Sequence, residues 1–298
     1  MTENDTPSPA PAETTEPSAP TDGGHPIAGG LVLPRIGFGT YPLRGATGLR
    51  ILSDALDVGY RMLDSAFNYE NEGTVGTAIR ASGIPRDQVV VASKLPGRHQ
   101  EYDKALEIVE ESVYRTGLES IDLYLIHWPN PKVGKYVEAW RALIEARERG
   151  LVKAIGVSNF LPEHLDRLTA ETGVTPVVNQ IELHPYFPQE EQRAYHAEHG
   201  IVTEAWSPLG RKTDLLGDPV IARIAADHGI EPGHAILSWH LALDTLPLPK
   251  SSSPERQRGN LEVPRADLLT PDEVAEITAL GRPDGRAAGQ DPAEYEEF

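Results

Sequence analysis

Cysteine is absent from this chain of 298 residues. Its absence excludes disulfides, thiolate metal sites, iron–sulfur clusters and cysteine nucleophiles together. Long apolar runs are missing as well: nothing approaches the roughly 18 consecutive apolar residues of a membrane helix, so we expect no spanning segment. The N-terminus has no basic stretch followed by an apolar core. We therefore expect no signal peptide and a cytoplasmic protein.

Basic residues are scarce, because 27 Lys and Arg stand against 45 Asp and Glu and give a formal net charge of -18. A chain this acidic repels phosphate backbones and anionic membrane surfaces, so we expect no nucleic acid and no membrane as partners. Aromatic residues make up only 6%, but the hydrophobic fraction of 39% is ample for a core. The length fits two domains or a single α/β barrel of about 250 residues.

Residues 1–26 differ in composition from the rest. They contain five acids, many Pro, Thr and Ala, and neither Lys nor Arg. Such a segment cannot bury enough apolar surface to offset the entropy lost on ordering. We predict a disordered acidic tail over residues 1–26 and one folded domain over residues 27–298.

Short apolar or β-branched runs alternate with longer amphipathic stretches from residue 31 onward. Several runs are continuously apolar, as in VVVAS and LYLI, which is typical of parallel strands buried on both faces. The eight expected strands are 35–39, 61–63, 89–92, 121–126, 153–157, 176–179, 201–205 and 246–248.

Helical patterns lie between these runs, clearest over residues 48–59, 104–117 and 138–150, the last ending at Gly150 as a C-cap. Eight strand–helix units predict an α/β fold of the closed (β/α)8 type, a TIM barrel. The alternative is a doubly wound open sheet. Its dinucleotide fingerprint is incomplete, because Pro42 follows Gly37 and Gly39 where the third glycine should stand.

Polar or chargeable residues follow nearly every predicted strand. In a barrel, the chemistry is built at the C-terminal ends of the strands, which meet at one face. We therefore expect these side chains to share a site. They are Asp64, Lys94, His127, Ser158 with Asn159, Gln180, Trp206 with Ser207, and Lys250.

Four residues predict acid catalysis: Asp64, Tyr69, Lys94 and His127. A tyrosine hydroxyl carries its proton at pH 7 and can donate it. A neighbouring Lys94 ammonium favours the phenolate and lowers the pKa of the phenol, and Asp64 can hold that ammonium charged. His127 can fix a carbonyl oxygen beside the tyrosine. The set is suited to protonating an oxygen as it becomes an alkoxide.

The motifs DSAFNYENE, VASKLP, DLYLIHWP, GVSNF, NQIELHPY, AWSPLG and PKSSSPERQRGN closely resemble the signatures of the aldo-keto reductases. The resemblance runs in order from about Leu33 to Asn260. It is nearest to the prokaryotic branch that includes 2,5-diketo-D-gluconate reductases, partly because Trp206 stands where many relatives have Tyr. It implies a barrel that transfers a hydride from NADPH to an aldehyde or ketone without metal.

The resemblance also implies a role for each matched residue. Tyr69 becomes the general acid, tuned by Lys94 and Asp64, and His127 orients the substrate. Tyr41 and Trp128 match positions that wall the substrate pocket. The implied cofactor-binding residues are Thr40, Ser158, Asn159, Gln180, Trp206, Ser207, Leu209, Lys250, Ser251, Arg256 and Asn260. Of these, Lys250, Ser251 and Arg256 would take the adenosine 2′-phosphate, which favours NADPH over NADH.

The C-terminal stretch is acidic and low in apolar residues, and it does not match the family residue by residue. In the family this region helps to close the substrate pocket, so the sequence leaves the choice of carbonyl substrate open. Nothing in the sequence indicates a coiled coil, and we expect a monomer.

Other patterns favour structural roles. His196 and His199 have a spacing compatible with metal, but a third ligand is missing, so we expect no metal site. His184 is expected to be a buried, hydrogen-bonded histidine. The basic residues Arg141, Arg147, Arg149 and Lys153 are expected to form a solvated helix face and turn.

Two alternative functions remain at this point. Lys94 could form a Schiff base, as in barrel aldolases, although Asp64, Tyr69 and the cofactor-like residues would then have no purpose. A non-catalytic barrel could bind nucleotide as a sensor or subunit. The presence of all four residues of the acid cluster favours catalysis.

Overall fold

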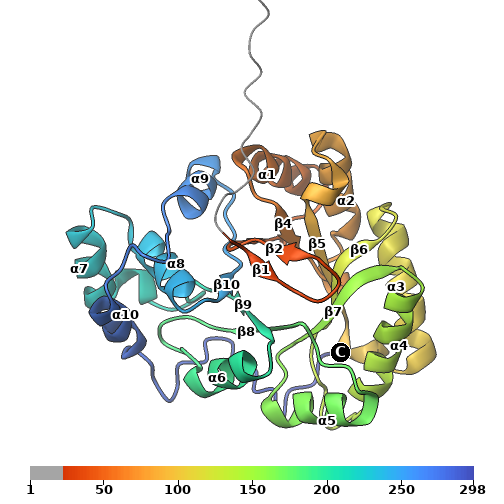
Figure 1. Cartoon of the computed structure of the whole chain (residues 1–298). Helices are drawn as coiled ribbons and strands as arrows, with labels where there is room; N and C mark the ends of the chain where they lie inside the picture. Colours follow the sequence, from red (N-terminus) through yellow and green to blue (C-terminus); the bar gives the residue numbers. More distant parts are fainter. Residues whose placement is uncertain (1–22) are drawn as a thin grey trace, which may run out of the picture.

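The computed structural model describes residues 23–298, which form a ring of helices around a central parallel sheet (Figure 1). Its eight strands are ordered β10-β9-β8-β7-β6-β5-β4-β3, so each strand lies beside its neighbours in the chain. The sheet closes on itself, because the backbone N–H groups of Gly37 and Gly39 donate to the carbonyls of Pro247 and Pro249, both at 3.1 Å. The predicted (β/α)8 barrel is confirmed.

The strands follow the expected order with shifted ends. The expected strand 35–39 pairs only over its last two residues, and the expected strand 176–179 begins after Pro176 and continues to Glu182. The strands are β3 (Phe38–Gly39), β4 (Met62–Asp64), β5 (Val90–Leu95), β6 (Ile121–Ile126), β7 (Val152–Ser158), β8 (Val178–Glu182), β9 (Val202–Trp206) and β10 (Leu246–Pro247).

The helices cover the outside of the barrel (Figure 1). The stretches predicted from periodicity correspond to the first, third and fourth of them, and five helices begin with Pro in the first turn, where its missing N–H is tolerated. The helices are α1 (Gly45–Val58), α2 (Glu72–Ser82), α3 (Tyr102–Thr116), α4 (Tyr136–Glu148), α5 (Pro162–Thr172), α6 (Glu190–Glu198), α7 (Pro219–Asp227), α8 (Pro232–Ala242), α9 (Pro254–Glu262) and α10 (Pro271–Thr278).

A short hairpin closes the N-terminal end of the barrel. Strand β1 (His25–Pro26) pairs antiparallel with β2 (Val32–Leu33), and in Figure 1 the hairpin lies across the centre of the ring. Leu33 is fully buried in the same apolar cluster as Met62 and Val90, which start β4 and β5. The predicted tail boundary at residue 26 is therefore too late, because residues 25 and 26 belong to this cap. The rest of the predicted tail, residues 1–22, lies outside the described residues.

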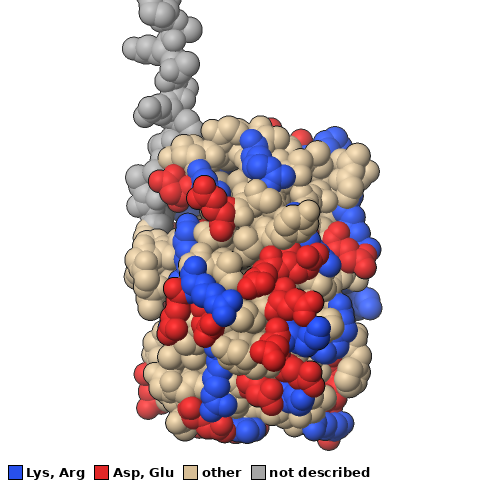
Figure 2. All heavy atoms as spheres, turned by 90° about the vertical axis from the view of Figure 1, so that its right-hand side faces the viewer, with Lys and Arg blue, Asp and Glu red and all other residues tan. Residues whose placement is uncertain are grey.

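The outer face over α3 and α4 carries both signs of charge, closely interspersed (Figure 2). Arg149 pairs with Glu145 at 2.5 Å, and Lys153 pairs with Asp122 at 2.7 Å. Arg141 lies 3.5 Å from a carboxylate oxygen of Glu171 on α5. Three of the four residues of the expected solvated basic face, Arg141, Arg149 and Lys153, are thus in ion pairs. Within residues 23–298, no helix has the length and apolarity needed to cross a membrane.

Candidate active site

A cavity of about 990 Å³ opens at the C-terminal ends of the strands. It gathers side chains from segments far apart in the sequence, as the barrel predicts. Lys94, Ser251, Arg256 and Asn260 are outside its lining. The thirteen predicted site residues that line it are Thr40, Tyr41, Asp64, Tyr69, His127, Trp128, Ser158, Asn159, Gln180, Trp206, Ser207, Leu209 and Lys250.

Lys94 lies behind this lining, on β5, and is completely buried. Its Nζ donates to both carboxylate oxygens of Asp64, at 2.7 and 2.8 Å, and to the carbonyl of Ser65 at 2.7 Å. Burial alone would lower the pKa of Lys94, but the Asp64 charge and hydrogen bonds outweigh it and the pKa is raised. The side chain is therefore a permanent ammonium with all three protons in use. A Schiff-base lysine must be neutral and free, so the geometry contradicts the aldolase alternative.

Tyr69 ends a single turn of 3-10 helix, Phe67–Tyr69, just after β4. The Lys94 ammonium lies 5.3 Å from the centre of its ring, and the His127 ring is 5.9 Å away, edge to face. Burial raises the pKa of Tyr69; Lys94 lowers it, but Asp64, Glu297 and Tyr41 add to the increase. Lys94 thus acts in the predicted direction, but burial leaves the pKa of Tyr69 raised overall. The phenol keeps its proton at pH 7.

His127 follows β6 directly, with its backbone N–H donating to the carbonyl of Leu95 at 3.0 Å. Its own carbonyl accepts a hydrogen bond from Asn159 Nδ2, also at 3.0 Å. The ring nitrogen Nδ1 lies 2.8 Å from a carboxylate oxygen of Glu297. Glu297 lines the cavity, and no motif in the sequence indicated this contact.

Gln180 connects the acid cluster to a buried glutamate on β9. Its Nε2 donates to Asp64 Oδ1 at 3.0 Å and to Glu204 Oε2 at 2.8 Å. Both amide hydrogens are therefore in use, and the group that Gln180 can offer to a ligand is its oxygen. Burial, reinforced by the charge of Asp64, raises the pKa of Glu204 to about 8. Glu204 is not among the predicted site residues, although a charged residue inside an apolar strand is itself a signal of a functional position.

Three more predicted residues form a network at the ends of β7 and β9. Trp206 Nε1 donates to Asn159 Oδ1 at 2.8 Å, and Asn159 Nδ2 donates to Ser158 Oγ at 3.0 Å. Ser158 Oγ in turn donates to the carbonyl of Gln180 at 2.8 Å. Asn159 has a φ of 64°, in the left-handed region where Asn is among the better tolerated residues. The network fixes the indole beside amide groups that can bind a carboxamide.

The remaining cofactor candidates lie just before α9 and along it. Lys250 and Arg256 are exposed, whereas Ser251 and Asn260 are buried. Ser253 is the N-cap, with its hydroxyl accepting from the backbone N–H of Arg256 at 3.4 Å, and Pro254 occupies the first position. Two cations thus flank a helix N-terminus, where the free backbone N–H groups favour an anion.

The histidines considered for other roles are held by protein groups. His196 lies within 2.9 Å of the amides of Asn179 and Gln192 and 2.8 Å from Thr203 Oγ1. Burial lowers its pKa to about 3. His184 is fully buried and lies 3.2 Å from Glu182 Oε1, as expected of a structural histidine.

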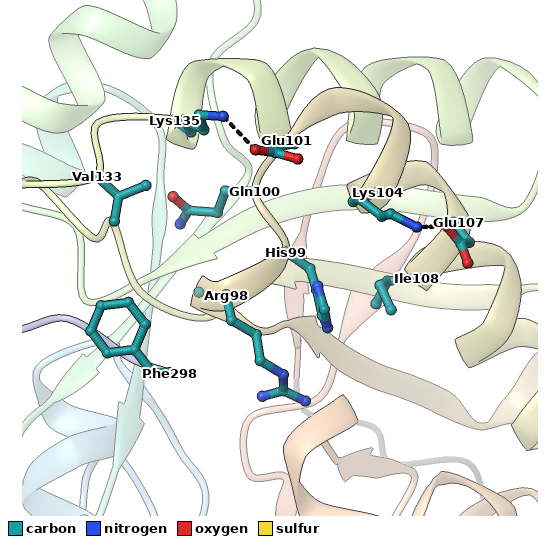
Figure 3. A pocket seen from close by; sticks show the side chains of 11 residues that line it. Arg98, His99, Gln100, Glu101, Lys104, Glu107, Ile108, Val133, Lys135 and Phe298 are labelled. Carbon is teal, nitrogen blue, oxygen red and sulfur yellow. Dashed lines mark hydrogen bonds and ion pairs between the residues drawn. The ribbon is translucent and has the colours of Figure 1, made fainter.

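A second cavity, of about 450 Å³, lies between the start of α3 and Phe298 (Figure 3). Two of its cations are already paired, Lys135 with Glu101 at 2.6 Å and Lys104 with Glu107 at 2.7 Å. None of the predicted catalytic residues lines it. The chemistry therefore belongs to the larger cavity.

A sequence model of the aldo/keto reductase family matches residues 35–282. The chain belongs to this family. It is 51% identical to 2,5-diketo-D-gluconic acid reductase B of Corynebacterium sp. (strain SHS752001), over 88% of this chain and 94% of the relative. It is 40% identical to methylglyoxal reductase DkgA of Salmonella typhimurium, over 89% and 95%. The resemblance to the bacterial branch of the aldo-keto reductases is thus confirmed.

Solved structures that are similar to this aldo-keto reductase agree with its barrel fold. An aldo/keto reductase from Brucella melitensis superposes with a TM-score of 0.81 at 42% identity, covering 86% of this chain and 98% of the other. A mutant of Gox0644 in complex with NADPH gives a TM-score of 0.85 at 40% identity, covering 91% and 97%.

Proposed function

We propose that this aldo-keto reductase reduces aldehydes or ketones to alcohols with NADPH, and that Tyr69 is the general acid. The observation that carries the proposal is the convergence of the Tyr69 phenol, the Lys94–Asp64 pair and the His127 ring on one cavity. The cofactor supplies the hydride when bound. The family membership and the NADPH complex of a relative support this choice of cofactor.

The donor set of the cavity fits a nicotinamide dinucleotide. Ser158, Asn159 and the Gln180 oxygen would hold the carboxamide, and the Trp206 indole offers a face for stacking. Ser207 and Leu209 line the part of the cavity that we expect to bind the pyrophosphate. Lys250, Ser251 and Arg256 at the start of α9 would hold a 2′-phosphate, with Asn260 near the adenine and Thr40 near the nicotinamide end. These assignments follow the family resemblance.

Tyr69 would give its phenolic proton to the substrate oxygen as that oxygen gains negative charge. Lys94 stabilises the phenolate that remains, because its ammonium lies 5.3 Å from the ring and cannot lose its charge while Asp64 is paired with it. His127 would hold the carbonyl oxygen within reach of the phenol. Tyr41 and Trp128 line the cavity and would wall the substrate side. A substrate packed against them would exclude water, which strengthens these interactions.

We further propose that residues 23–298 act as one catalytic domain, with the acidic segment before residue 23 outside it. The same proposal takes the protein to be a cytoplasmic monomer whose partner is a small carbonyl compound. Size-exclusion chromatography with light scattering would test the monomer, and a mass near twice the chain mass would refute it.

The test of Tyr69 is its replacement by Phe, which removes the donated proton and leaves the ring in place. Tyr69→Phe is expected to slow the chemical step at least ~100-fold, the low end for general acid catalysis, with NADPH affinity little altered. Tyr114→Phe, at an 82% exposed position on α3, is the matched control.

The measurement is NADPH consumption with a panel of aldehydes and ketones, together with tryptophan quenching by NADPH. Near-normal turnover in Tyr69→Phe would refute the assignment of the acid. NADPH binding by the unchanged protein without turnover on any carbonyl would instead favour a nucleotide-binding sensor.

A further inference from the structure

A turn in the loop after β9 places Arg211 at the main cavity. The backbone N–H of Thr213 donates to the carbonyl of Gly210 at 3.0 Å and closes a four-residue turn, in which Arg211 and Lys212 are the central residues. Lys212 has a φ of 67°, as the second central residue of a type II turn requires. Both central residues line the cavity. The turn therefore gives Arg211 a defined place in the loop.

The guanidinium of Arg211 lies over an aromatic side chain of the cavity. Its Cζ is 5.4 Å from the centre of the Tyr41 ring, within the range of a cation–π contact. The Tyr41 ring is itself 5.0 Å from the ring of Tyr69, edge to face. Tyr41 thus contacts both the cation and the proposed acid. The positive charge therefore lies on the side of the cavity where we expect the carbonyl substrate to bind.

The donors of Arg211 are available to a ligand. Within residues 23–298, its side chain forms neither an ion pair nor a hydrogen bond, and its contact is with the Tyr41 ring. Asp214, the acid nearest to it in the chain, lies 3.9 Å from Arg282 instead. Because the Arg211 side chain is exposed, a ligand can reach its N–H groups.

The two acids that line the cavity, Asp64 and Glu297, are held by other groups. Asp64 accepts hydrogen bonds from Lys94 Nζ at 2.7 and 2.8 Å. Glu297 Oε2 accepts from the backbone N–H of Gly97 at 2.8 Å, and its other oxygen also has a donor. In the described part of the chain, Arg211 therefore has no anionic partner, and an anionic ligand would supply one.

We propose that Arg211 is a specificity-determining residue that binds a carboxylate on the carbonyl substrate. The inference rests on the proposed function of the site, and it makes oxo acids the preferred class of substrate. A guanidinium can hold a carboxylate through two parallel N–H···O hydrogen bonds, which fix its orientation as well as its distance. The carbonyl end of the substrate would lie at the phenol of Tyr69, and the charged end would extend past Tyr41 to Arg211.

The pyrophosphate of the cofactor is the other anion that could reach this turn. The contact with Tyr41 favours the substrate, because Tyr41 lies beside Tyr69, the proposed acid. Lys212 and Lys250 also line the cavity and can neutralise cofactor phosphates without Arg211. The two possibilities predict different results, since a substrate without a carboxylate would be affected by one and not by the other.

Matched pairs of aldehydes test the proposal. Each pair consists of an aldehyde that carries a carboxylate and its methyl ester, such as para-formylbenzoate and its ester, together with aliphatic oxo acids of several chain lengths. The unchanged protein should have a higher kcat/KM for the acid than for the ester. Arg211→Gln should lower this acid-to-ester ratio about 10-fold, because a hydrogen bond to a charged group is lost. NADPH affinity should stay within twofold.

Two further variants complete the comparison. Arg211→Lys keeps the charge but loses the planar fork, so it should retain part of the preference for acids. Arg223→Gln is the control for the loss of one positive charge. Arg223 is exposed on α7, lies outside the cavity lining and pairs with Asp227 at 3.3 Å. Its replacement should leave the acid-to-ester ratio and NADPH affinity unchanged.

An unchanged acid-to-ester ratio in Arg211→Gln would overturn the proposal, and so would the absence of any preference for acids in the unchanged protein. Weaker NADPH binding with equal losses for acid and ester would also overturn it, and would assign Arg211 to the pyrophosphate.

Failure of the proposed function is a separate result, which would appear as absent turnover of acids and esters alike. Calorimetric titration of the protein with benzoate and benzamide, in the presence of NADP+, would then still decide the role of Arg211. Benzoate should bind more weakly to Arg211→Gln than to the unchanged protein, whereas benzamide should bind equally to both. Equal binding of benzoate to the two proteins would overturn the proposal.

Discussion

Arg256 is an exposed side chain on the first turn of α9, beside Lys250 and the buried Ser251. If these three residues bind the 2′-phosphate of NADPH, Arg256→Ala should weaken NADPH binding about 10- to 150-fold. The reason is that a hydrogen bond to a charged group contributes roughly 1.5–3 kcal/mol. NADH affinity should hardly change, because NADH lacks the phosphate. Titrations of NADPH and NADH, followed by the quenching of tryptophan fluorescence, measure both affinities in the unchanged protein and in Arg256→Ala.

Arg258→Ala provides the control for Arg256 on the same helix. Arg258 is exposed and pairs with Glu262 at 3.2 Å, one turn further along α9. Its removal should leave both affinities unchanged. Equal weakening of NADPH and NADH in Arg256→Ala would mean that Arg256 supports the fold of this region, and the phosphate site would be misassigned.

Single residues also show where sequence reasoning reaches its limit. Asp64, Lys94 and His127 could be predicted to meet because each stands at a strand end, and parallel strand ends in a barrel share one face. Glu297 could not, because its acidic segment has neither periodicity nor a motif. Its contact depends on the path of the chain after α10 and on the anchoring amide of Asn130.

At the scale of elements, the β1–β2 hairpin means that the effect of an N-terminal deletion on stability depends on whether the deletion removes β1. Removing residues 1–26 takes away β1 and uncovers Leu33, so we expect a loss of roughly 1–2 kcal/mol, or about 2–6 °C in Tm. Removing residues 1–22 leaves the hairpin complete. Because residues 1–22 have few apolar side chains, that deletion should leave Tm and turnover unchanged.

Thermal unfolding of the two truncated proteins, side by side, measures the difference. The same Tm for both would show that the hairpin adds nothing to stability. The sequence did not reveal this hairpin, because its strands are two residues long and show no alternation. The longer strands β5 and β6, by contrast, were predictable from their continuous apolar runs.

For the whole molecule, buried ionisable groups set the pH of greatest stability. His196 and His240 have pKa values lowered to about 3 by burial. The unfolded chain therefore binds more protons below pH 6.5, and stability falls as the pH falls. Glu204 acts in the opposite sense: its pKa of about 8 means that stability falls as the pH rises from about 4.5 to 8.

Among these three groups, the two histidines have the larger effect on stability below pH 6.5 and Glu204 has the larger effect above it, so together they favour maximal stability near pH 6.5. Each group contributes at most about 1.4 kcal/mol per pH unit. Urea unfolding between pH 5 and 8 measures the curve. In Glu204→Gln, the decline above pH 6.5 should disappear; an identical decline in both proteins would show that Glu204 is not its source.

The two ends of the described chain lie at opposite ends of the barrel: β1 closes the N-terminal side, and Glu297 enters the cavity on the other. An enzyme tethered to a solid support through its N-terminal segment would therefore present its pocket to the solution. A linker or affinity tag joined to Phe298, which is 78% exposed, would start one residue from the carboxylate beside His127. Immobilisation should accordingly preserve substrate access in the first orientation and hinder it in the second.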